Sequence, residues 1–357
     1  MYQLIQNTLQ QLLNDENSFY AFRQPGEETL YIAIIKKVEP FNYSVLDKEV
    51  KEPGFIMFPF SQTDENGWIF SAENTIALDA PNQQNARPSK YQIQVNEEPD
   101  EACNYVGQFK KMMEALNNGE VQKVILSRTI KITEPLQKDI YRIFTDLLKL
   151  HPKAFTYLVV SKETGIWMGA SPELLISRQD GICTTVSLAG TRPHDANDES
   201  WTHKEKEEQG LVSNYIDNLL KNYKITEYKK EGPSIIKAGN LTHLKTLYTF
   251  KNKTSLRLAH FVQALHPTPA LCGEPKEKAM HLIKKVETHK RSYYSGFLGP
   301  ISKNALNLYV NIRCMKINPS YSTIYVGGGL TRQSDLESEW NETILKSKTL
   351  LSVISTQ

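Results

Sequence analysis

The strongest constraint on the fold is a row of four short β-rich runs between residues 155 and 192, namely FTYLVV, GIWMGA, ELLISR and ICTTVSLAG. Glu-Thr-Gly and Asp-Gly sequences between these runs are typical of tight turns joining antiparallel strands. Parallel strands need long crossover connections, and these short turns exclude them. The segment therefore predicts an antiparallel meander.

Further segments complete the predicted secondary structure. Apolar periodicity predicts a short amphipathic helix near the N-terminus and later helices that end at Gly119 or span about 138–150, 198–222, 255–265, 275–286 and 336–351. Strand-like runs are LYIAIIKKV, GFIMFPF, VQKVILSRTI, YYSGFLG, ALNLYVNIRCMKI and STIYVGGG. The polar stretch 79–89 is typical of a loop. Because the strands cluster in hairpins instead of alternating with helices, the predicted fold class is α+β.

Charge and cysteine content limit the possible functional classes. A net charge of +2 over 357 residues gives no electrostatic basis for binding nucleic acid or an anionic membrane. The four cysteines lie far apart and form no CxxC or Cys/His metal motif, as is typical of reduced cysteines in a cytosolic protein. No apolar run approaches membrane-spanning length, and the first residues do not resemble a signal peptide. We therefore expect a soluble, cytoplasmic protein.

The long helix predicted over 198–222 carries two acidic residues on its apolar side. At about 100° per residue, Glu205 and Glu208 project onto one stripe with the apolar residues Leu211, Val212, Tyr215, Ile216 and Leu219. A carboxylate that faces a protein core is costly without a partner. The pattern therefore favours a paired or metal-bound role for both acids.

The terminal helix carries a second acidic pair, Glu339 and Glu342, whose like charges repel at this spacing. Trp340 and Ile344 lie on roughly the opposite side of the helix from this acidic pair. Periodicity alone therefore favours a solvated acidic face. In the alternative, the two ExxE pairs jointly hold a hard divalent cation such as Mg²⁺, which takes oxygen ligands.

Lys123 and Glu173 are candidate acid–base residues. Lys123 shares a strand face with Val121 and Ile125, and desolvation lowers the pKa of a buried lysine, which suits such a group to general base catalysis. An edge-strand lysine that reaches water is the alternative, and the isolated segment favours it. Glu173 begins a β-rich run after a proline. Burial raises the pKa of a carboxyl and suits it to act as a general acid, whereas an exposed strand-end glutamate is the open alternative.

Arg313 and three consecutive glycines are candidate anion-binding features. Arg313 interrupts a strongly apolar run, and a buried arginine needs an anion from the protein or from a ligand. Gly327, Gly328 and Gly329 end a predicted strand, where bare backbone N–H groups can approach an anion. A structural glycine turn is the alternative. His243 is a polar interruption without a decisive interpretation of its own.

Taken together, the motifs from about residue 100 onward resemble the chorismate-utilising enzymes. That family includes isochorismate synthase, salicylate synthase, and component I of anthranilate and aminodeoxychorismate synthases. The matching segments are VQKVILSR, GASPELL, SLAGTRP, LHPTPALCGEP, YYSGFLG, VNIRC, VGGGL and ESEWNETILKSKTLL. The resemblance implies a single large domain in which antiparallel β-sheets enclose the site and helices pack outside. It implies that residues 1–95 form the variable N-terminal part of this fold and that residues 96–357 form the chorismate-binding catalytic region.

The resemblance also implies a cofactor. Its Mg²⁺ ligands fall on Glu208 and Glu342, with Glu205 and Glu339 supporting them through water or as further ligands. The residue after Glu208 is Gln209, where many members have histidine. This departure concerns the surroundings of the implied metal site.

The remaining implied roles concern the substrate. Lys123 resembles the water-activating base, and Glu173 the acid that protonates the departing C4 hydroxyl. Arg313, Tyr294 and the glycine backbone are expected to hold the enolpyruvyl carboxylate, while Mg²⁺ is expected at the ring carboxylate. The complete implied substrate-binding set is Gly190, Thr191, His243, Ala270, Tyr294, Arg313, Gly328, Gly329 and Lys346.

Two motifs bear on the branch of the family. Members that use ammonia generally lack a lysine where Lys123 stands, and the segment around Ala270, LHPTPALCGEP, resembles that of isochorismate synthases. The implied activity is a Mg²⁺-dependent, reversible conversion of chorismate to isochorismate, with no amidotransferase subunit. Salicylate synthase and a chorismate-binding subunit that requires an amidotransferase partner are the alternatives. Both menaquinone and catecholate siderophore synthesis use isochorismate, and the motifs fit either.

Overall fold

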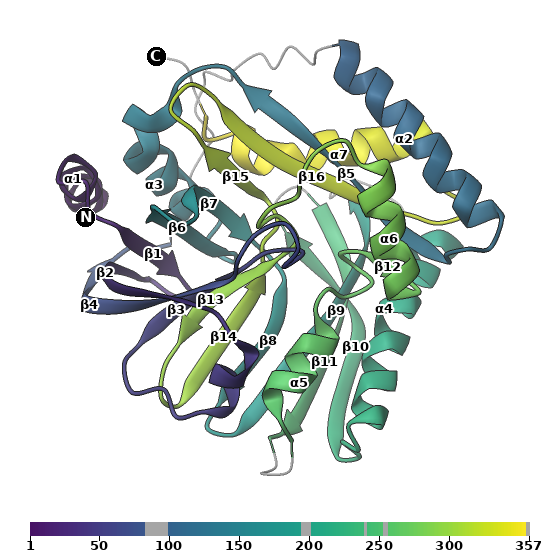
Figure 1. The fold of residues 1–357 in the computed structure, drawn as a ribbon, viewed down its shortest axis with the longest axis horizontal. Helices are drawn as coiled ribbons and strands as arrows, with labels where there is room; N and C mark the ends of the chain where they lie inside the picture. The colour runs from purple at the N-terminus through teal and green to yellow at the C-terminus, as the bar shows by residue number, and fades with distance from the viewer. Residues whose placement is uncertain (83–98, 194–200, 239–240, 253–255, 355–357) are drawn as a thin grey trace.

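The computed structural model describes residues 1–82, 99–193, 201–238, 241–252 and 256–354 (Figure 1). The helices are α1 (Tyr2–Asn14), α2 (Pro99–Asn117), α3 (Ile140–Leu150), α4 (His203–Asn222), α5 (Leu258–Leu265), α6 (Lys276–Val286) and α7 (Leu336–Leu351). The strands are β1 (Phe19–Arg23), β2 (Thr29–Pro40), β3 (Gly54–Phe58), β4 (Trp68–Asp79), β5 (Lys123–Ile132), β6 (Phe155–Ser161), β7 (Gly165–Ser171), β8 (Leu174–Gln179), β9 (Ile182–Pro193), β10 (Tyr228–Ala238), β11 (Leu241–Lys251), β12 (Gly273–Glu274), β13 (Phe297–Ile301), β14 (Ala305–Val310), β15 (Cys314–Ile317) and β16 (Ser322–Leu330).

These strands form one antiparallel sheet in the order β10-β11-β9-β8-β14-β13-β3-β4-β2-β1-β6-β7-β15-β16-β5-β12. The predicted meander is present, since β6 pairs with β7 and β8 pairs with β9, in both cases antiparallel. Long helices accompany the sheet without alternating strictly with its strands. The predicted α+β class is therefore confirmed, as a single domain built on a large antiparallel sheet.

The sheet curls until strands from its two ends face each other. β9 and β11 lie near one end of the strand order, and β5 and β16 lie near the other. Residues from all four strands nevertheless line the same cavity. In Figure 1 the β9–β11 region lies below the β5–β16 region, with the interior between them. This curvature brings together segments that are distant in the sequence.

Helices cover the outer side of these strands. α4 packs against β9, and α7 packs against β16, so the two acidic helices sit on opposite ends of the sheet. α2 and α6 pack against β5, while α1 packs against α3. Figure 1 shows α2, α4 and α6 along one outer side of the molecule. Among the described residues, none of these helices combines the length and apolar character needed to cross a membrane.

The N-terminal strands lie in the middle of the sheet. β3 pairs with β13, and β1 pairs with β6, so β1–β4 connect the two halves of the strand order. Residues 19–79 are thus integrated into the same sheet as the rest of the chain. The boundary expected at residue 95 lies outside the described residues.

One predicted strand is wrong because it is two strands. The run ALNLYVNIRCMKI breaks between β14 and β15, which pair with different neighbours. Arg313 has a φ of 51°, a left-handed conformation that is uncommon for a residue with a side chain. Its carbonyl accepts a 3.1 Å hydrogen bond from the Ala170 N–H, which holds the reversal in place. Because of this break, Arg313 leaves the line of the strand and lines the cavity.

Other differences are smaller. The hairpin of β10 and β11 was not among the predicted strands. The YYSGFLG strand begins only at Phe297, after a turn. α4 begins at His203, where Thr202 and Glu205 form a capping box, and α5 begins at Leu258. The remaining parts of those two predicted helices and of the predicted 79–89 loop include residues 198–200, 255 and 83–89, which lie outside the described residues.

Candidate active site

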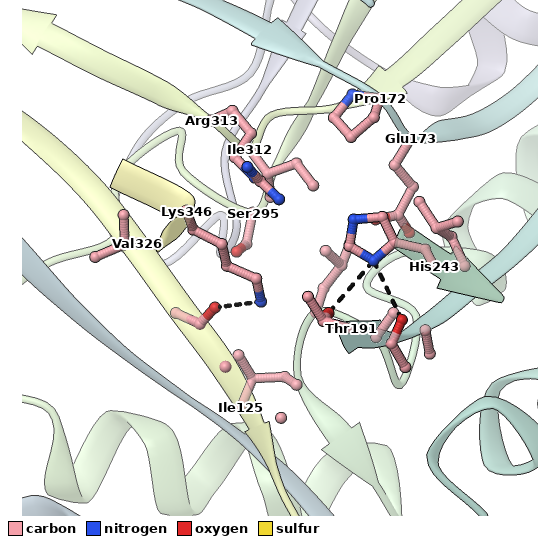
Figure 2. Close-up of a pocket in the computed structure, with 18 of the residues that line it drawn as sticks. Ile125, Pro172, Glu173, Thr191, His243, Ser295, Ile312, Arg313, Val326 and Lys346 are labelled. Atoms are coloured by element: carbon pink, nitrogen blue, oxygen red, sulfur yellow. Dashed lines mark hydrogen bonds between the residues drawn. The ribbon is translucent and has the colours of Figure 1, made fainter. Parts of the chain in front are cut away.

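Most of the predicted site residues line one cavity between the two ends of the sheet (Figure 2). Those that line it are Glu173, Gly190, Thr191, Glu208, His243, Ala270, Tyr294, Arg313, Gly328, Gly329 and Lys346. Lys123, Glu205, Glu339 and Glu342 are not lining residues. The cavity therefore gathers residues from four strands, β5, β9, β11 and β16, from both acidic helices and from the connecting loops.

Lys123 lies directly behind the cavity wall. β5 is paired on one side with β16 and on the other with β12, so the edge-strand interpretation of this lysine is wrong. Its side chain is fully buried, and Nζ lies 2.9 Å from Glu208 Oε1. The contact is an ion pair without the alignment of a good hydrogen bond. An amine and a carboxylate from two different elements thus meet at the edge of the site.

The glycines of β16 leave the space that this pair occupies. A Cβ on Gly329 would overlap Glu208 Oε1 and lie 3.0 Å from Lys123 Cε. A Cβ on Gly328 would lie 3.0 Å from Glu339 Oε2. The glycines are paired residues within β16, so the alternative of a glycine turn is wrong. Their role in the structure is to let charged side chains approach the strand closely.

Glu173 enters the cavity from the connection between β7 and β8. It is 5% exposed, which excludes the strand-end alternative. Desolvation by burial raises the pKa of Glu173 to about 7, although the nearby charges of Lys123 and Lys346 act in the opposite direction. The protonated and ionised forms of Glu173 therefore coexist near neutral pH. A carboxyl in this state can donate a proton to a bound molecule.

His243 lies beside Glu173, with one ring nitrogen bonded and the other facing the cavity (Figure 2). Its Nδ1 lies 3.2 Å from the Gly190 carbonyl oxygen and 3.3 Å from Thr191 Oγ1. Gly190, at φ 73°, occupies an irregularity in the β9–β11 register. Burial lowers the pKa of His243 to about 3, so the ring is neutral at pH 7. With Nδ1–H donating to the carbonyl, the buried and unpartnered Nε2 can accept a hydrogen bond from a ligand.

Arg313 and Lys346 face the cavity from the side opposite Glu173 and His243 (Figure 2). Arg313 Nη1 donates a 2.9 Å hydrogen bond to Thr349 Oγ1, and burial lowers the pKa of the guanidinium to about 10. Lys346 Nζ donates a 2.8 Å hydrogen bond to the Gly327 carbonyl and lies 2.5 Å from Glu342 Oε1. Two cations on one wall can bind an anionic group.

The acidic face of α7 points inward. Glu339 is 1% exposed, so the solvated face favoured by periodicity is wrong. Ser334 Oγ donates a 2.7 Å hydrogen bond to Glu339 Oε1, and Lys204 Nζ also contacts this oxygen. Desolvation, and then the charge of Glu342, raise the pKa of Glu339 to about 7. The helix buries polar residues here because the glycines of β16 place no side chains against it.

Glu205 and Gln209 are held by local structure. Glu205 Oε2 accepts hydrogen bonds from the backbone N–H and hydroxyl of Thr202, so the side chain caps α4. Arg192 Nε lies 3.6 Å from its other oxygen. Gln209 Nε2 donates a 2.7 Å hydrogen bond to Thr246 Oγ1, which joins α4 to β11. Neither residue lines the cavity, and the supporting metal role expected for Glu205 stays a prediction.

Several site residues were not singled out from the sequence. Lys204, the partner of Glu339, stands four residues before Glu208 on the same helix face, and that spacing was the available signal. The apolar and aromatic residues that line the cavity gave no signal in the sequence that would separate them from core residues. They include Ile125, Leu188, Leu271, Ile312, Tyr325 and Val326.

The donor set is suited to a hard cation. The candidate ligands are all carboxylate oxygens, the atoms that Mg²⁺ prefers, and Glu339 Oε2 is buried without a partner. Among the described residues, however, no group of three or more Asp, Glu, His or Cys side chains is close enough to hold an ion alone. The protein therefore offers separate acidic pairs, which fit a Mg²⁺ that keeps waters and an anionic group of its ligand.

The arrangement defines a class of protein, one whose cavity lies between the ends of a curled antiparallel sheet and is suited to bind a small anionic molecule. The family described as "Chorismate binding enzyme" matches residues 60–355, and this chain belongs to that family. The crystal structure of DhbC from Bacillus anthracis has the same fold, with a TM-score of 0.77 and 21% sequence identity, covering 97% of this chain and 99% of that chain.

Two relatives are similar in sequence. The vibriobactin-specific isochorismate synthase of Vibrio cholerae is 30% identical over 251 residues, which are 67% of this chain and 64% of the relative. Isochorismate synthase EntC of Escherichia coli K12 is 28% identical over 244 residues, which are 66% of this chain and 62% of the relative. The matched region thus spans less than two thirds of the length of either relative.

Proposed function

We propose that this protein is an isochorismate synthase, which converts chorismate reversibly to isochorismate with Mg²⁺ as cofactor. The observation that carries the proposal is the placement of a buried amine and a partly protonated carboxyl at one cavity. Lys123 lies at the wall beside Gly329, and Glu173 lines the cavity with a pKa near 7. The two relatives that carry this name add support from sequence.

In the proposed reaction, a water molecule forms a bond to C2 of the ring while the C4–O bond breaks. Lys123 Nζ takes a proton from the attacking water. The ring double bonds shift, and Glu173 gives its proton to the departing hydroxyl. Reactant and product differ in the position of one hydroxyl, so in the reverse direction the two residues exchange their roles.

The remaining cavity residues would orient the substrate. Arg313 is the strongest candidate for binding the enolpyruvyl carboxylate, because its guanidinium is buried and forms no ion pair with a carboxylate among the described residues. Tyr294 stacks on Tyr325 with ring centroids 5.5 Å apart, and both side chains line the same cavity. The free Nε2 of His243 is suited to accept a hydrogen bond from a substrate hydroxyl.

Glu208 and Glu342 would hold the Mg²⁺, with Glu339 beside them. When bound, the ion would neutralise the ring carboxylate of chorismate and polarise the ring toward attack at C2. In the described structure, Lys123 pairs with Glu208, and Lys346 pairs with Glu342. These lysines offset the acidic charge that would otherwise be buried without a counter-ion.

The proposed role of Lys123 also bears on which partner molecules the enzyme needs. Lys123 is suited to activate water, so we propose that the enzyme needs neither ammonia nor an amidotransferase subunit. We also propose that it binds no nucleic acid, because its net charge of +2 gives no electrostatic basis for such binding. A cytoplasmic location is proposed with it. All four cysteines are free thiols, as is usual for a protein in a reducing compartment.

The test is to incubate purified protein with chorismate, with and without Mg²⁺, and to separate the products by chromatography. Isochorismate that forms only with Mg²⁺, up to a fixed chorismate–isochorismate ratio, is the expected result. Salicylate plus pyruvate would identify the alternative salicylate synthase activity. No conversion, even with added ammonium, would favour a binding subunit that needs an amidotransferase.

A further inference from the structure

A second cavity adjoins the candidate active site. It has a volume of about 700 Å³, compared with about 80 Å³ for the active-site cavity on the same measure. Its walls come from the segment between α3 and β6, from β10 and β11, and from Thr349 of α7. Arg313 and Pro172 line both cavities. The two spaces therefore meet at these residues, and the outer one is large enough to hold a small organic molecule.

The outer cavity is lined by basic side chains. Lys153, Lys237 and Lys245 line it together with Arg313, and the lining residues, all of them described, include no Asp or Glu. The remaining titratable side chains in its wall are His151 and Tyr309. Burial lowers the pKa of His151 to about 4, so this ring adds no charge at neutral pH. A cavity lined by one sign of charge concentrates ions of the opposite sign.

The basic groups continue from the outer cavity into the active site. Arg313 Nη1 is fixed by a 2.9 Å hydrogen bond to Thr349, an outer-cavity residue. The guanidinium also faces the active-site cavity, where Lys346 points in from the same side (Figure 2). Pro172, directly before Glu173, lies on the facing wall beside Glu173 (Figure 2) and also lines the outer cavity. A carboxylate that moves from the outer cavity to the active site can therefore leave the lysines of the outer cavity and bind Arg313, so that it keeps a cationic partner.

We propose that the outer cavity is an anion-binding entrance to the active site, through which a small dicarboxylate reaches Arg313. This inference rests on the proposed function, because chorismate carries two carboxylates. Lys153, which is exposed, would bind the incoming anion first. Lys245, which is half-buried, would then bind it before it reaches Arg313. The lysines act in binding and take no part in the proton transfers.

The first test is kinetic and uses the double variant Lys153→Ala/Lys245→Ala. Electrostatic steering changes association by about tenfold or more, so kcat/KM for chorismate should fall by about tenfold while kcat is retained. The loss should shrink as ionic strength rises, because salt screens the lysine charges. The matched control is Lys131→Ala/Lys303→Ala, which removes the same net charge from residues that line neither cavity. Equal kcat/KM values and equal salt dependence in the two double variants would overturn the proposal.

The second test does not need turnover. Isophthalate, an aromatic dicarboxylate that cannot undergo the reaction, is titrated into the wild-type protein and both double variants by calorimetry. Weaker binding only in Lys153→Ala/Lys245→Ala is expected. If wild-type protein fails to convert chorismate but shows this binding difference, the proposed function fails and the anion-binding cavity stands. If isophthalate binds all three proteins equally, the cavity assignment is wrong whatever the activity.

Discussion

Lys123 Nζ and Glu208 Oε1 lie 2.9 Å apart, joining the candidate base on β5 to a candidate metal ligand on α4. The lysine side chain is fully buried, and that of Glu208 is 14% exposed, so each charge depends on the other for compensation. A cation that binds Glu208 competes with the lysine for the same oxygen. Binding of a metal ion at Glu208 would therefore be coupled to the freedom of the Lys123 amine.

Replacing the amine of Lys123 should lower the catalytic rate steeply. We expect Lys123→Gln to lower kcat for isochorismate formation by about 10²–10⁴-fold, the usual contribution of a general base. Product formation is measured by chromatography, and folding by circular dichroism. Lys131→Gln is the control, because Lys131 is an exposed lysine of the same strand. Unchanged turnover in a folded Lys123→Gln protein would remove this residue as the base.

The rate should depend on pH through Glu173. Its pKa is raised to about 7, and the forward reaction needs the protonated form, which is lost as pH rises. We therefore expect kcat/KM to carry a descending limb above pH 7, with a slope of up to about tenfold per pH unit. Initial rates in buffers of constant ionic strength measure this limb. A level profile on both sides of pH 7 would exclude Glu173 as the acid.

The same pKa shift affects stability. Between the ordinary pKa of 4.5 and about 7, the unfolded chain releases a proton that folded Glu173 retains. Wild-type stability therefore falls as pH rises through this window, and below pH 4.5 the effect vanishes. Glu173→Gln removes the cost of ionising a buried carboxyl. At pH 8 the free energy of unfolding of the variant should therefore exceed that of the wild type by on the order of 3 kcal/mol. Urea denaturation at pH 4 and pH 8 measures the difference, and an equal gain at both values would contradict the assignment.

Mg²⁺ affinity should depend on the acidic face of α7. We expect Glu342→Gln to raise the Mg²⁺ concentration needed for half-maximal activity by at least about tenfold, since it removes an oxygen ligand and a charge. Calorimetric titration with Mg²⁺ gives a second readout. Glu337→Gln is the control, because Glu337 lies in the first turn of the same helix and is exposed. Identical titrations for the two variants would count against the metal site.

The close approach of β16 to the ion pair can be tested with one methyl group. Gly329→Ala places a Cβ against Glu208 Oε1 and Lys123 Cε. Both atoms belong to flexible side chains, so we expect the fold to persist and kcat/KM to fall by about a hundredfold. Gly210→Ala is the control, since its Cβ would meet nothing within 4 Å. That helical substitution should retain activity and add about 1 kcal/mol of stability. Comparable activity in both variants would show that the space beside Gly329 is not needed.

Periodicity succeeded on one acidic helix and failed on the other. On α4 three residues of the predicted apolar stripe, Val212, Ile216 and Leu219, are buried, and Glu208 on the same side of the helix reaches the cavity wall. On α7 the buried residues are Glu339, Thr343, Ser347, Thr349 and Leu350, four of them polar, while Trp340 is covered instead by Arg128, whose guanidinium carbon lies 3.9 Å from the ring centroid. Periodicity assumes that apolar residues face the interior, and this helix packs against a glycine strand beside a charged site.

The sequence by itself determined the antiparallel meander, the α+β class, the two acidic helices and, through the resemblance of its motifs, the family and the identities of most candidate site residues. These follow from local patterns of hydrophobicity, turns and motif spacing. Only the tertiary structure decided that Lys123 is buried between two strands, that Glu339 faces inward with Lys204, and that Arg313 joins two cavities. The physical reason is that burial and charge pairing depend on how the sheet curls. That curvature brings β9 and β11 against β5 and β16, and no local segment encodes the distance between them.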